Sequence, residues 1–399
     1  MDAPLGRSED RRSSAEPPKA GFGRRRFLVV MAGAAAYSAL RPSVGWSRRL
    51  ARPLPPLQPW GLPVDPPADV LELGRALVGA AVLAPSQWNS QPWRLEVNGS
   101  AVRLLADPSR AFPINDPERR GMMLSLGAAL ENLLVALRAY GFRPGVTYFP
   151  TGEKGAVVAG VSWSRGDGRR DRDLFAAITE RRTNRRTYDG RGLFMQNRSA
   201  LTAVVPDDLH LHWVEDRDRI RKIGDLTYDA TRDRVLDRRA EAEIYAWTRF
   251  GHDDARERGD GVTVDDLELN GPARWLAGRY LHPESRLRGL GAGSMAKQAR
   301  EQVRSAGALA LLTTPRGSEA AWLLAGQTYE RFALRATHLG IAHQPLDAPL
   351  RAPRHRADLA REFEVGGEQP LMLLRLGHAK RPRPSMRRGV ALVASFRNS

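Results

Sequence analysis

The sequence contains no cysteine, and this absence removes several kinds of chemistry at once. Without thiols the chain cannot form disulfides, use a thiolate nucleophile, or hold zinc or iron–sulfur clusters through sulfur. The Gly-x-Ser-x-Gly turn of many hydrolases and the His-Glu-x-x-His helix of zinc proteases are missing too. His210 and His212 would share one face of a strand, but no third ligand accompanies them. We therefore expect no bound metal.

Lysine is also scarce, because only five of the 62 basic residues are lysines and the other 57 are arginines. The formal net charge is +17. Such a basic chain can bind nucleic acid, anionic lipid or a phosphorylated small molecule, although solvated arginines are the simpler interpretation. The sequence has no zinc-finger or RNP pattern, so we expect no nucleic-acid partner.

The N-terminus has the composition of a targeting segment. Three arginines at 24–26 precede an apolar run of 14 residues from Phe27 to Leu40. A membrane-spanning helix needs about 20 residues. Paired arginines ahead of a short apolar run are typical of a twin-arginine export signal. We predict passage through the twin-arginine translocase and an extracytoplasmic or periplasmic location, with a membrane tether if the signal is not cleaved. A chance junction of basic and apolar residues is the alternative.

The apolar spacing alternates between strand-like and helix-like segments. It predicts helices over 70–81, 119–140, 174–180 and 319–339, and strands over 93–97, 101–105, 156–163, 308–314 and 370–376. Further helical segments are expected over 217–252 and 295–306, and a flexible loop over 289–294. Strands mixed with long helices indicate an α+β fold with a mixed sheet flanked by helices.

The two longest predicted helices resemble each other. Both end at a glycine, and three positions match at an offset of 199 residues: Gly127, Glu131 and Gly141 with Gly326, Glu330 and Gly340. Together with similar neighbouring strands, the match indicates an internal duplication. We divide the chain into a signal and basic N-terminus (1–52), a Pro-rich tether (53–68), a first half (69–175), a second half (176–390) with a lid insertion at about 240–306, and a tail (391–399).

Three segments combine residue types that suit a cofactor. Residues 84–93, APSQWNSQPW, form a polar loop that two prolines stiffen. Residues 181–186, RRTNRR, and the run SMRR that begins at Ser385 place arginine forks beside hydroxyls. Arginine forks bind phosphate monoesters well, although two solvated arginine clusters are the alternative.

These three segments resemble the signatures of the FMN-dependent nitroreductases. The loop at 84–93 is similar to the family's Pro-Ser-x-x-Asn-x-Gln-Pro-Trp motif. Arg181-x-Thr183-x-Arg185 is similar to an Arg-x-Ser-x-Arg/Lys motif, with threonine for serine. The segment from Pro384 to Arg388 resembles the basic end that contacts the flavin phosphate, without its usual lysine. The likeness spans roughly residues 69–390.

The resemblance implies an FMN site and names its residues. Ser86, Gln87, Asn89 and Gln91, with Pro85 stiffening the loop, would face polar flavin atoms. Thr183 and Arg185 would meet the ribityl chain or the pyrimidine edge, and Arg181, Arg182, Ser385, Arg387 and Arg388 would surround the phosphate. FMN carries the chemistry, so no catalytic acid or base is named. Trp88 would stack on the ring, shield it, or simply pack in the loop; Trp93 is expected in the core.

The order of the motifs adds a further expectation. In ordinary family members each site of a homodimer takes the loop from one subunit and the arginines from the other. Here the first half has only the loop and the second half only the arginines. The chain therefore resembles the Acg-type branch, which implies a fused pseudo-dimer, monomeric, with one FMN between its halves.

Three functional hypotheses follow. The first is an oxidoreductase that moves electrons from NAD(P)H or another donor through FMN to a nitro, quinone or similar small-molecule acceptor. The second is an FMN-binding or sequestering protein with a closed lid and little turnover. The third is a basic protein whose tail binds anionic surfaces, which would show steep salt dependence.

Overall fold

The computed structural model describes residues 61–397, apart from 154, 269–281, 283 and 286–287. The predicted export signal and the first part of the tether lie outside the described residues.

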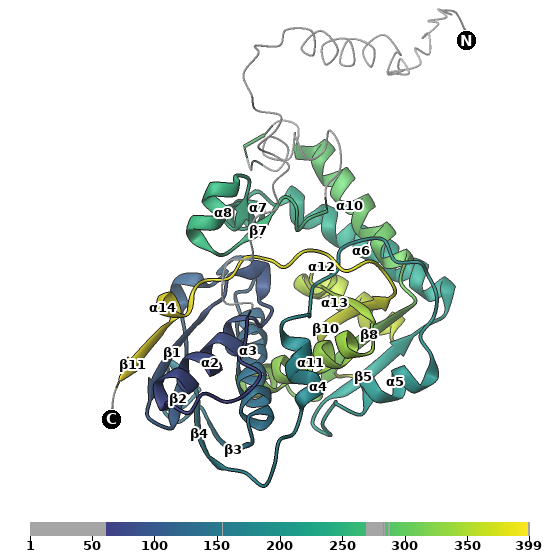
Figure 1. Cartoon of the computed structure of the whole chain (residues 1–399). Coiled ribbons are helices and arrows are strands. Elements are labelled where there is room, and N and C mark those ends of the chain that lie inside the picture. The colour runs from purple at the N-terminus through teal and green to yellow at the C-terminus, as the bar shows by residue number, and fades with distance from the viewer. Residues whose placement is uncertain (1–60, 154, 269–281, 283, 286–287, 398–399) are drawn as a thin grey trace, which may run out of the picture. The chain divides into compact units, whose positions relative to one another are not determined.

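The first half forms one sheet with helices packed on it (Figure 1). Its elements are α2 (Val70–Val82), β1 (Trp93–Asn98), β2 (Ala101–Ala106), α3 (Arg120–Ala139), β3 (Phe142–Tyr148) and β4 (Val157–Arg165). The strand order is β11-β1-β2-β4-β3. All pairs are antiparallel except β1 with β11 (Ala394–Arg397), so this sheet is mixed.

The second half repeats this topology. Its elements are β5 (His210–Val214), β8 (Ala308–Thr314), α11 (Glu319–His338), β9 (Ala342–Leu346) and β10 (Gln369–Gly377). The strand order β5-β8-β10-β9, antiparallel throughout, matches β1-β2-β4-β3 strand for strand. In both halves a long helix connects the second strand to the third. The α+β class and the two tandem halves are confirmed.

The helices α3 and α11 lie between the two sheets and pack against each other (Figure 1). The matched glycines meet at this contact. A Cβ on Gly127 would lie 2.0 Å from the carbonyl oxygen of Leu323, and a Cβ on Gly326 would lie 2.2 Å from that of Leu124. Only glycine allows backbones to approach so closely. Because Leu124 and Leu323 are themselves 199 residues apart, the contact has the symmetry of the duplication.

A large insertion separates β5 from β8, whereas a two-residue turn separates β1 from β2. It contains α6 (Arg217–Leu236), α7 (Arg238–Ala246), β6 (Thr248–Arg249), α8 (His252–Arg258), β7 (Val262–Thr263) and α10 (Arg288–Arg304). The predicted flexible loop at 289–294 is wrong, because these residues belong to α10. Packing of α10 on α6, with Ala292 and Ala296 buried, outweighs the local cost of the glycines.

The remaining elements are short. They are η2 (Gln87–Asn89), η3 (Pro108–Arg110), α4 (Arg172–Ile178), α5 (Met195–Thr202), α12 (Ala348–Arg351), α13 (Pro353–Glu362) and α14 (Val390–Val393). Within the described residues, α3 alone is long and apolar enough to cross a membrane, and 89% of its most apolar window is buried inside the protein. Its apolar character is that of a core helix.

Candidate functional site

The loop between α2 and β1 has an unusual backbone. Trp88, Asn89 and Gln91 all have positive φ values, of 49°, 54° and 51°. Non-glycine residues rarely adopt this left-handed conformation, and clusters of it occur where surrounding contacts enforce it, often at functional sites. Part of the loop forms η2, and the backbone N–H of Gln87 donates to Ser125 Oγ on α3 at 3.1 Å.

Asn89 ties this loop to two distant segments. Its Nδ2 donates to the carbonyl of Gly261 in the insertion (2.9 Å) and to that of Met386 near the C-terminus (3.0 Å). Its Oδ1 accepts from Nη1 of Arg387 at 3.0 Å. All of these bonds are buried, so one amide fixes the meeting point of the three segments.

Gln91 and Arg388 hold the backbone of neighbouring segments in place. Gln91 Nε2 donates to the carbonyl of Gly259 (2.8 Å), and its Oε1 accepts from the backbone N–H of Arg388 (2.9 Å). The Arg388 guanidinium donates to the carbonyls of Gln91 and Leu392. Neither side chain lines the two cavities described next.

The loop, the 181–185 segment and the C-terminal segment enclose a small arginine-rich cavity. It is lined by Pro85, Ser86, Asn89, Arg181, Arg182, Thr183, Arg185, Gly261, Val262, Asp266, Ser385 and Arg387. Thus the structure brings together most of the residues that the sequence nominated, from three distant parts of the chain.

The arginines of this cavity are held in an electrostatically costly arrangement. Burial lowers the pKa of Arg387 to about 9, and the positive charges of Arg181 and Arg182 add to that effect. Burial likewise lowers the pKa of Arg182 to about 10, with Arg181 contributing. Like charges packed together in a buried site indicate that an anion completes the arrangement.

Two acidic groups offset part of this charge. Asp266 accepts from the hydroxyls of Ser385 (3.1 Å) and Thr263 (2.7 Å). Behind the cavity, Glu330 of α11 is fully buried and lies 3.3 Å from Arg181 Nε. Burial raises the pKa of Glu330 to about 7, and Arg181 opposes the rise. Four arginines against two carboxylates leave a formal charge of +2, which matches a phosphate monoester dianion.

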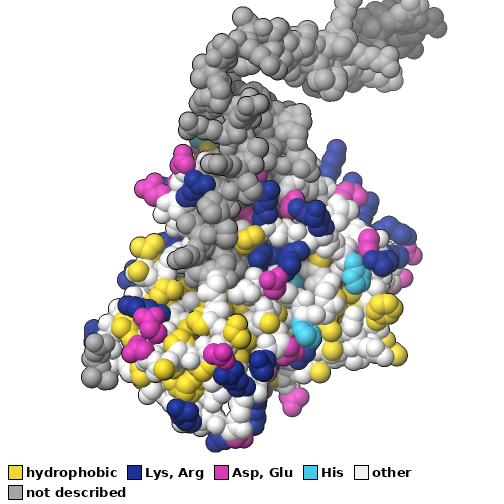
Figure 2. All heavy atoms as spheres, in the orientation of Figure 1, with side chains coloured by type: hydrophobic (Ala, Val, Ile, Leu, Met, Phe, Trp, Pro, Cys, Tyr) yellow, Lys and Arg dark blue, Asp and Glu magenta, His cyan; other side chains and the backbone are white. Residues whose placement is uncertain are grey.

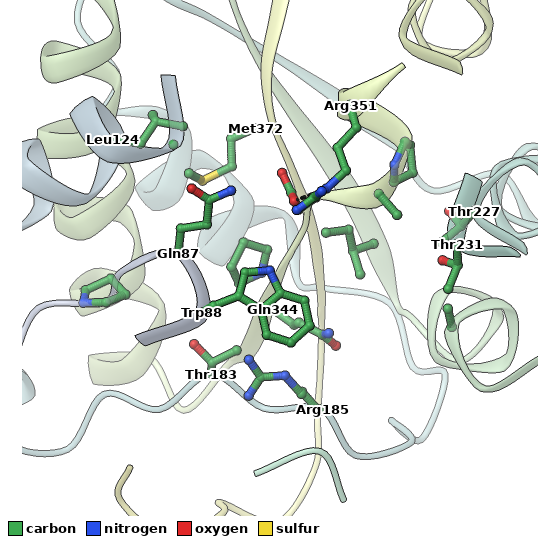
Figure 3. Close-up of a pocket in the computed structure, with 18 of the residues that line it drawn as sticks. Gln87, Trp88, Leu124, Thr183, Arg185, Thr227, Thr231, Gln344, Arg351 and Met372 are labelled. Carbon is green, nitrogen blue, oxygen red and sulfur yellow. Dashed lines mark hydrogen bonds and ion pairs between the residues drawn. The ribbon is translucent and has the colours of Figure 1, made fainter. Parts of the chain in front are cut away.

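A larger cavity of ≈ 280 Å³ adjoins the small one and shares four of its residues, Pro85, Ser86, Thr183 and Arg185. Its apolar walls include Leu124, Leu346 and Met372. Figure 3 shows Gln87, Trp88, Thr183 and Arg185 around one common space. The described residues leave Gln87 Oε1 and the Tyr329 hydroxyl, both on this cavity, buried without a hydrogen-bond partner.

The insertion forms one wall of this larger cavity. Thr227, Thr231 and Arg234 of α6 and Ala299 and Gln302 of α10 line it. The Arg234 guanidinium carbon lies 5.8 Å from the centre of the Trp88 ring. Trp88 is therefore a cavity residue, whereas Trp93 is fully buried in the core as expected.

Several lining residues were not nominated from the sequence. They come from α6, α10 and the stretch 344–351, and only the general expectation of a lid over 240–306 pointed toward any of them. Their residue types carry no motif. Helical spacing could show that α6 and α10 exist, but not that their polar faces meet at a cavity.

The described residues provide no metal site, and the face in Figure 2 has no dominant basic patch. No group of three histidine, aspartate or glutamate side chains among the described residues could hold a metal ion. On the face in Figure 2, basic side chains are interspersed with acidic ones. Many arginines form surface ion pairs, such as Arg198 with Glu215 and Arg304 with Asp225.

Two Mycobacterium tuberculosis proteins named "Putative NAD(P)H nitroreductase" are similar to this chain. One is 30% identical over 319 residues, covering 77% of this chain and 86% of that protein. The chain belongs to the nitroreductase family. The other, acg, is 30% identical over 188 residues, covering 44% of this chain and 53% of that protein. No protein-family model matches the chain.

Solved nitroreductase structures match about half of this chain. The FMN-dependent nitroreductase NfnB from Mycobacterium smegmatis, in complex with NADPH, is 19% identical, covers 56% of this chain and 98% of its own, and has a TM-score of 0.32. A nitroreductase with bound FMN from Bacteroides fragilis is 15% identical, covers 52% and 88%, and has a TM-score of 0.30.

Proposed function

We propose that this protein is an FMN-dependent oxidoreductase that holds one FMN per chain in the two joined cavities. The observation that carries the proposal is the pairing of a compact, arginine-lined cavity with a wider, largely apolar one through four shared residues. FMN has the same two parts, a charged phosphate and a planar tricyclic ring. The family membership and the names of its relatives agree with this assignment.

The residues present fit this cofactor. Arg181, Arg182 and Arg387 would hold the phosphate, and Thr183 and Arg185, at the junction, would meet the ribityl chain or the pyrimidine edge. Gln87 Oε1 and the Tyr329 hydroxyl, which have no partner among the described residues, would pair with polar groups on the ring after small side-chain shifts. Asp266 is the one lining group of the wrong sign for a phosphate, but its two oxygens already accept from Ser385 and Thr263.

Bound FMN would supply hydride acceptance from a donor and transfer to an acceptor. The protein's part is electrostatic and steric. Arg185 would supply a desolvated cation to stabilise the negative charge of a reduced flavin bound at this junction. The walls from α6 and α10 would limit the access of water to a ring bound in the larger cavity. The donor in this proposal is NAD(P)H or another reductant, and the acceptor is a nitro compound, a quinone or a similar small molecule.

The second candidate function is FMN binding or sequestration with little turnover. It is favoured by the insertion, which forms one wall of the larger cavity and narrows access to it. The two candidates share the cofactor and differ in access to it.

An absorbance spectrum of the native full-length protein, followed by anaerobic addition of NAD(P)H, tests both candidates. Flavin absorbance that bleaches rapidly and returns with a nitro or quinone acceptor supports the oxidoreductase. Bound flavin that neither NAD(P)H nor dithionite reduces quickly supports sequestration. Absence of flavin, together with no uptake of added FMN, contradicts both.

Two further properties belong to this proposal. The chain is a monomeric pseudo-dimer in which the halves replace the two subunits of a homodimer, and light scattering should give the mass of one chain.

The chain is also exported by the twin-arginine route. Changing Arg24 and Arg25 to lysine should keep the protein in the cytoplasm, and unchanged fractionation would contradict export.

A further inference from the structure

The larger cavity has a second cationic region, away from the residues that it shares with the phosphate-sized one. Arg234 of α6 and Arg351 of α12 line the larger cavity only. In Figure 3, Arg351 and Arg185 approach Trp88 from different sides. A flavin phosphate in the small cavity would therefore leave these two arginines without an assigned ligand group.

Arg351 has one side of its guanidinium paired and the other side buried without a partner among the described residues. Its Nε donates to Asp347 Oδ2 at 2.7 Å, and its side chain is only 12% exposed. Its Nη2 is buried and has no hydrogen-bond partner within the described part of the chain. A buried guanidinium N–H without an acceptor is unfavourable, and a ligand oxyanion would satisfy it with a charge-assisted hydrogen bond.

Arg234 places a second positive charge nearby. Its Nη1 donates to Glu241 Oε2 at 2.7 Å, and its side chain is 8% exposed. Burial lowers the pKa of Arg234, the charge of Arg351 adds to that effect, and Glu241 opposes it. Among the described residues, three arginines but only one carboxylate, that of Asp347, line the larger cavity.

The walls beside these arginines are apolar. Leu124, Pro345, Leu346, Pro349 and Met372 line the same space. An occupant of this region should therefore combine an apolar body with an oxyanion at one end. A neutral aromatic molecule would leave the Arg351 N–H unsatisfied, and a small inorganic anion would leave the apolar walls uncovered.

We propose that the electron acceptor is an aromatic molecule carrying a carboxylate, and that Arg351 binds this carboxylate with Arg234 beside it. The inference rests on the proposed FMN-dependent function and adds the chemical class of the substrate. Arg351 and Arg234 are specificity-determining residues and take no part in electron transfer.

The test compares 4-nitrobenzoate with its neutral analogue 4-nitrobenzamide on the full-length, FMN-loaded protein. Binding is followed by the change in flavin absorbance on titration, without a reductant. We expect the carboxylate to bind about 10-fold more tightly. The preference should vanish in Arg351→Gln and persist in part in Arg351→Lys. It should be unchanged in Arg354→Gln, which removes a neighbouring arginine that is 68% exposed and lies outside the cavity. Thermal unfolding and FMN content show whether each variant is folded.

The outcomes separate this inference from the proposed function. If wild-type protein binds no FMN, the proposed function is wrong. If it binds FMN but shows no carboxylate preference, or if the preference survives in folded Arg351→Gln, the substrate inference alone is overturned. The same titrations with NADH and NADPH distinguish a donor phosphate from an acceptor carboxylate. If Arg351→Gln no longer distinguishes NADPH from NADH but still prefers the carboxylate, the substrate inference is also overturned. If Arg351→Gln does not fold, Arg351→Lys and Arg234→Lys provide the comparison.

Discussion

The two halves of the molecule share a topology but use equivalent residues differently. Glu131 of α3 and Glu330 of α11 are 199 residues apart and belong to the same repeated helix. Glu131 pairs with Arg331 at 2.7 Å in a partly exposed network that also includes Asp171. Glu330 is fully buried beside Arg181, at the arginine-rich cavity.

The difference shows that duplication of a scaffold does not duplicate a site. The first half contributes the strained loop at 84–93, and the second half contributes the arginines and the insertion. Each half alone lacks the other's component. The symmetric contact of Gly127 with Gly326 holds these components in register, although it lies outside both cavities.

The largest expected effect comes from breaking that symmetric contact. Gly127→Ala and Gly326→Ala each place a methyl group about 2 Å from a backbone oxygen of the opposing helix, so α3 and α11 must separate. We expect each to lower the free energy of unfolding by about 3 kcal/mol, measured by urea denaturation. The double variant should cost less than the sum, because one separation relieves both clashes.

Gly293→Ala is the matched control, because a Cβ there meets no atom within 4 Å and the residue lies inside α10. It should be neutral or stabilise by up to about 1 kcal/mol. Equal destabilisation by all three variants would contradict the role of the helix contact.

The next prediction compares the ion pair of Arg181 with Glu330 and the ion pair of Arg331 with Glu131. Arg181→Gln should weaken FMN binding about 30-fold, measured by fluorescence titration of apoprotein, because a charge-assisted contact to phosphate is lost. Arg331→Gln breaks the ion pair of Glu131, the residue equivalent to Glu330, away from both cavities, and should leave FMN affinity within about 2-fold while lowering stability. Equal loss of affinity in both variants would show that the effect is structural.

The last comparison concerns the pH dependence that Glu330 adds to apoprotein stability. Its pKa rises from 4.5 to about 7 on folding, so the folded state holds its proton more tightly than the unfolded state. Stability should therefore fall as the pH rises from 4.5 to 7, by up to about 1.4 kcal/mol per unit. Glu330→Gln should remove this slope, whereas the exposed Glu153→Gln should not. An unchanged slope in Glu330→Gln would contradict the raised pKa.

Sequence patterns located most of the central elements but missed the two edge strands β3 and β9, among others, for a common reason. β3 contains Pro144 and β9 contains Pro345, and proline lowers any strand prediction. Both strands lie at a sheet edge, where one side of the strand has no neighbour in the ladder and proline is tolerated. Whether a strand is at an edge depends on pairing with distant residues, which local spacing does not contain.

The sequence likewise predicted the candidate site only in part. The motifs nominated Asn89, Arg181 and Arg387 because their residue types suit a flavin, and the structure brings them to one cavity. The motifs also nominated Gln91 and Arg388, whose hydrogen bonds instead hold the surrounding backbone. A motif contains both kinds of residue. The motif alone therefore does not distinguish a side chain that lines the cavity from one that supports the surrounding backbone.

By itself, the sequence determined the α+β class, the duplication and the three segments that could serve a phosphorylated cofactor. These three conclusions depend on the spacing of apolar residues, the positions of glycines and the types of residue in each segment, which are local properties of the sequence. Only the tertiary structure decided that residues 289–294 belong to helix α10, that α6 and α10 wall the larger cavity, and that Arg351 has an unsatisfied N–H there. Burial and hydrogen-bond satisfaction depend on the arrangement of atoms from distant segments, and no local pattern encodes it.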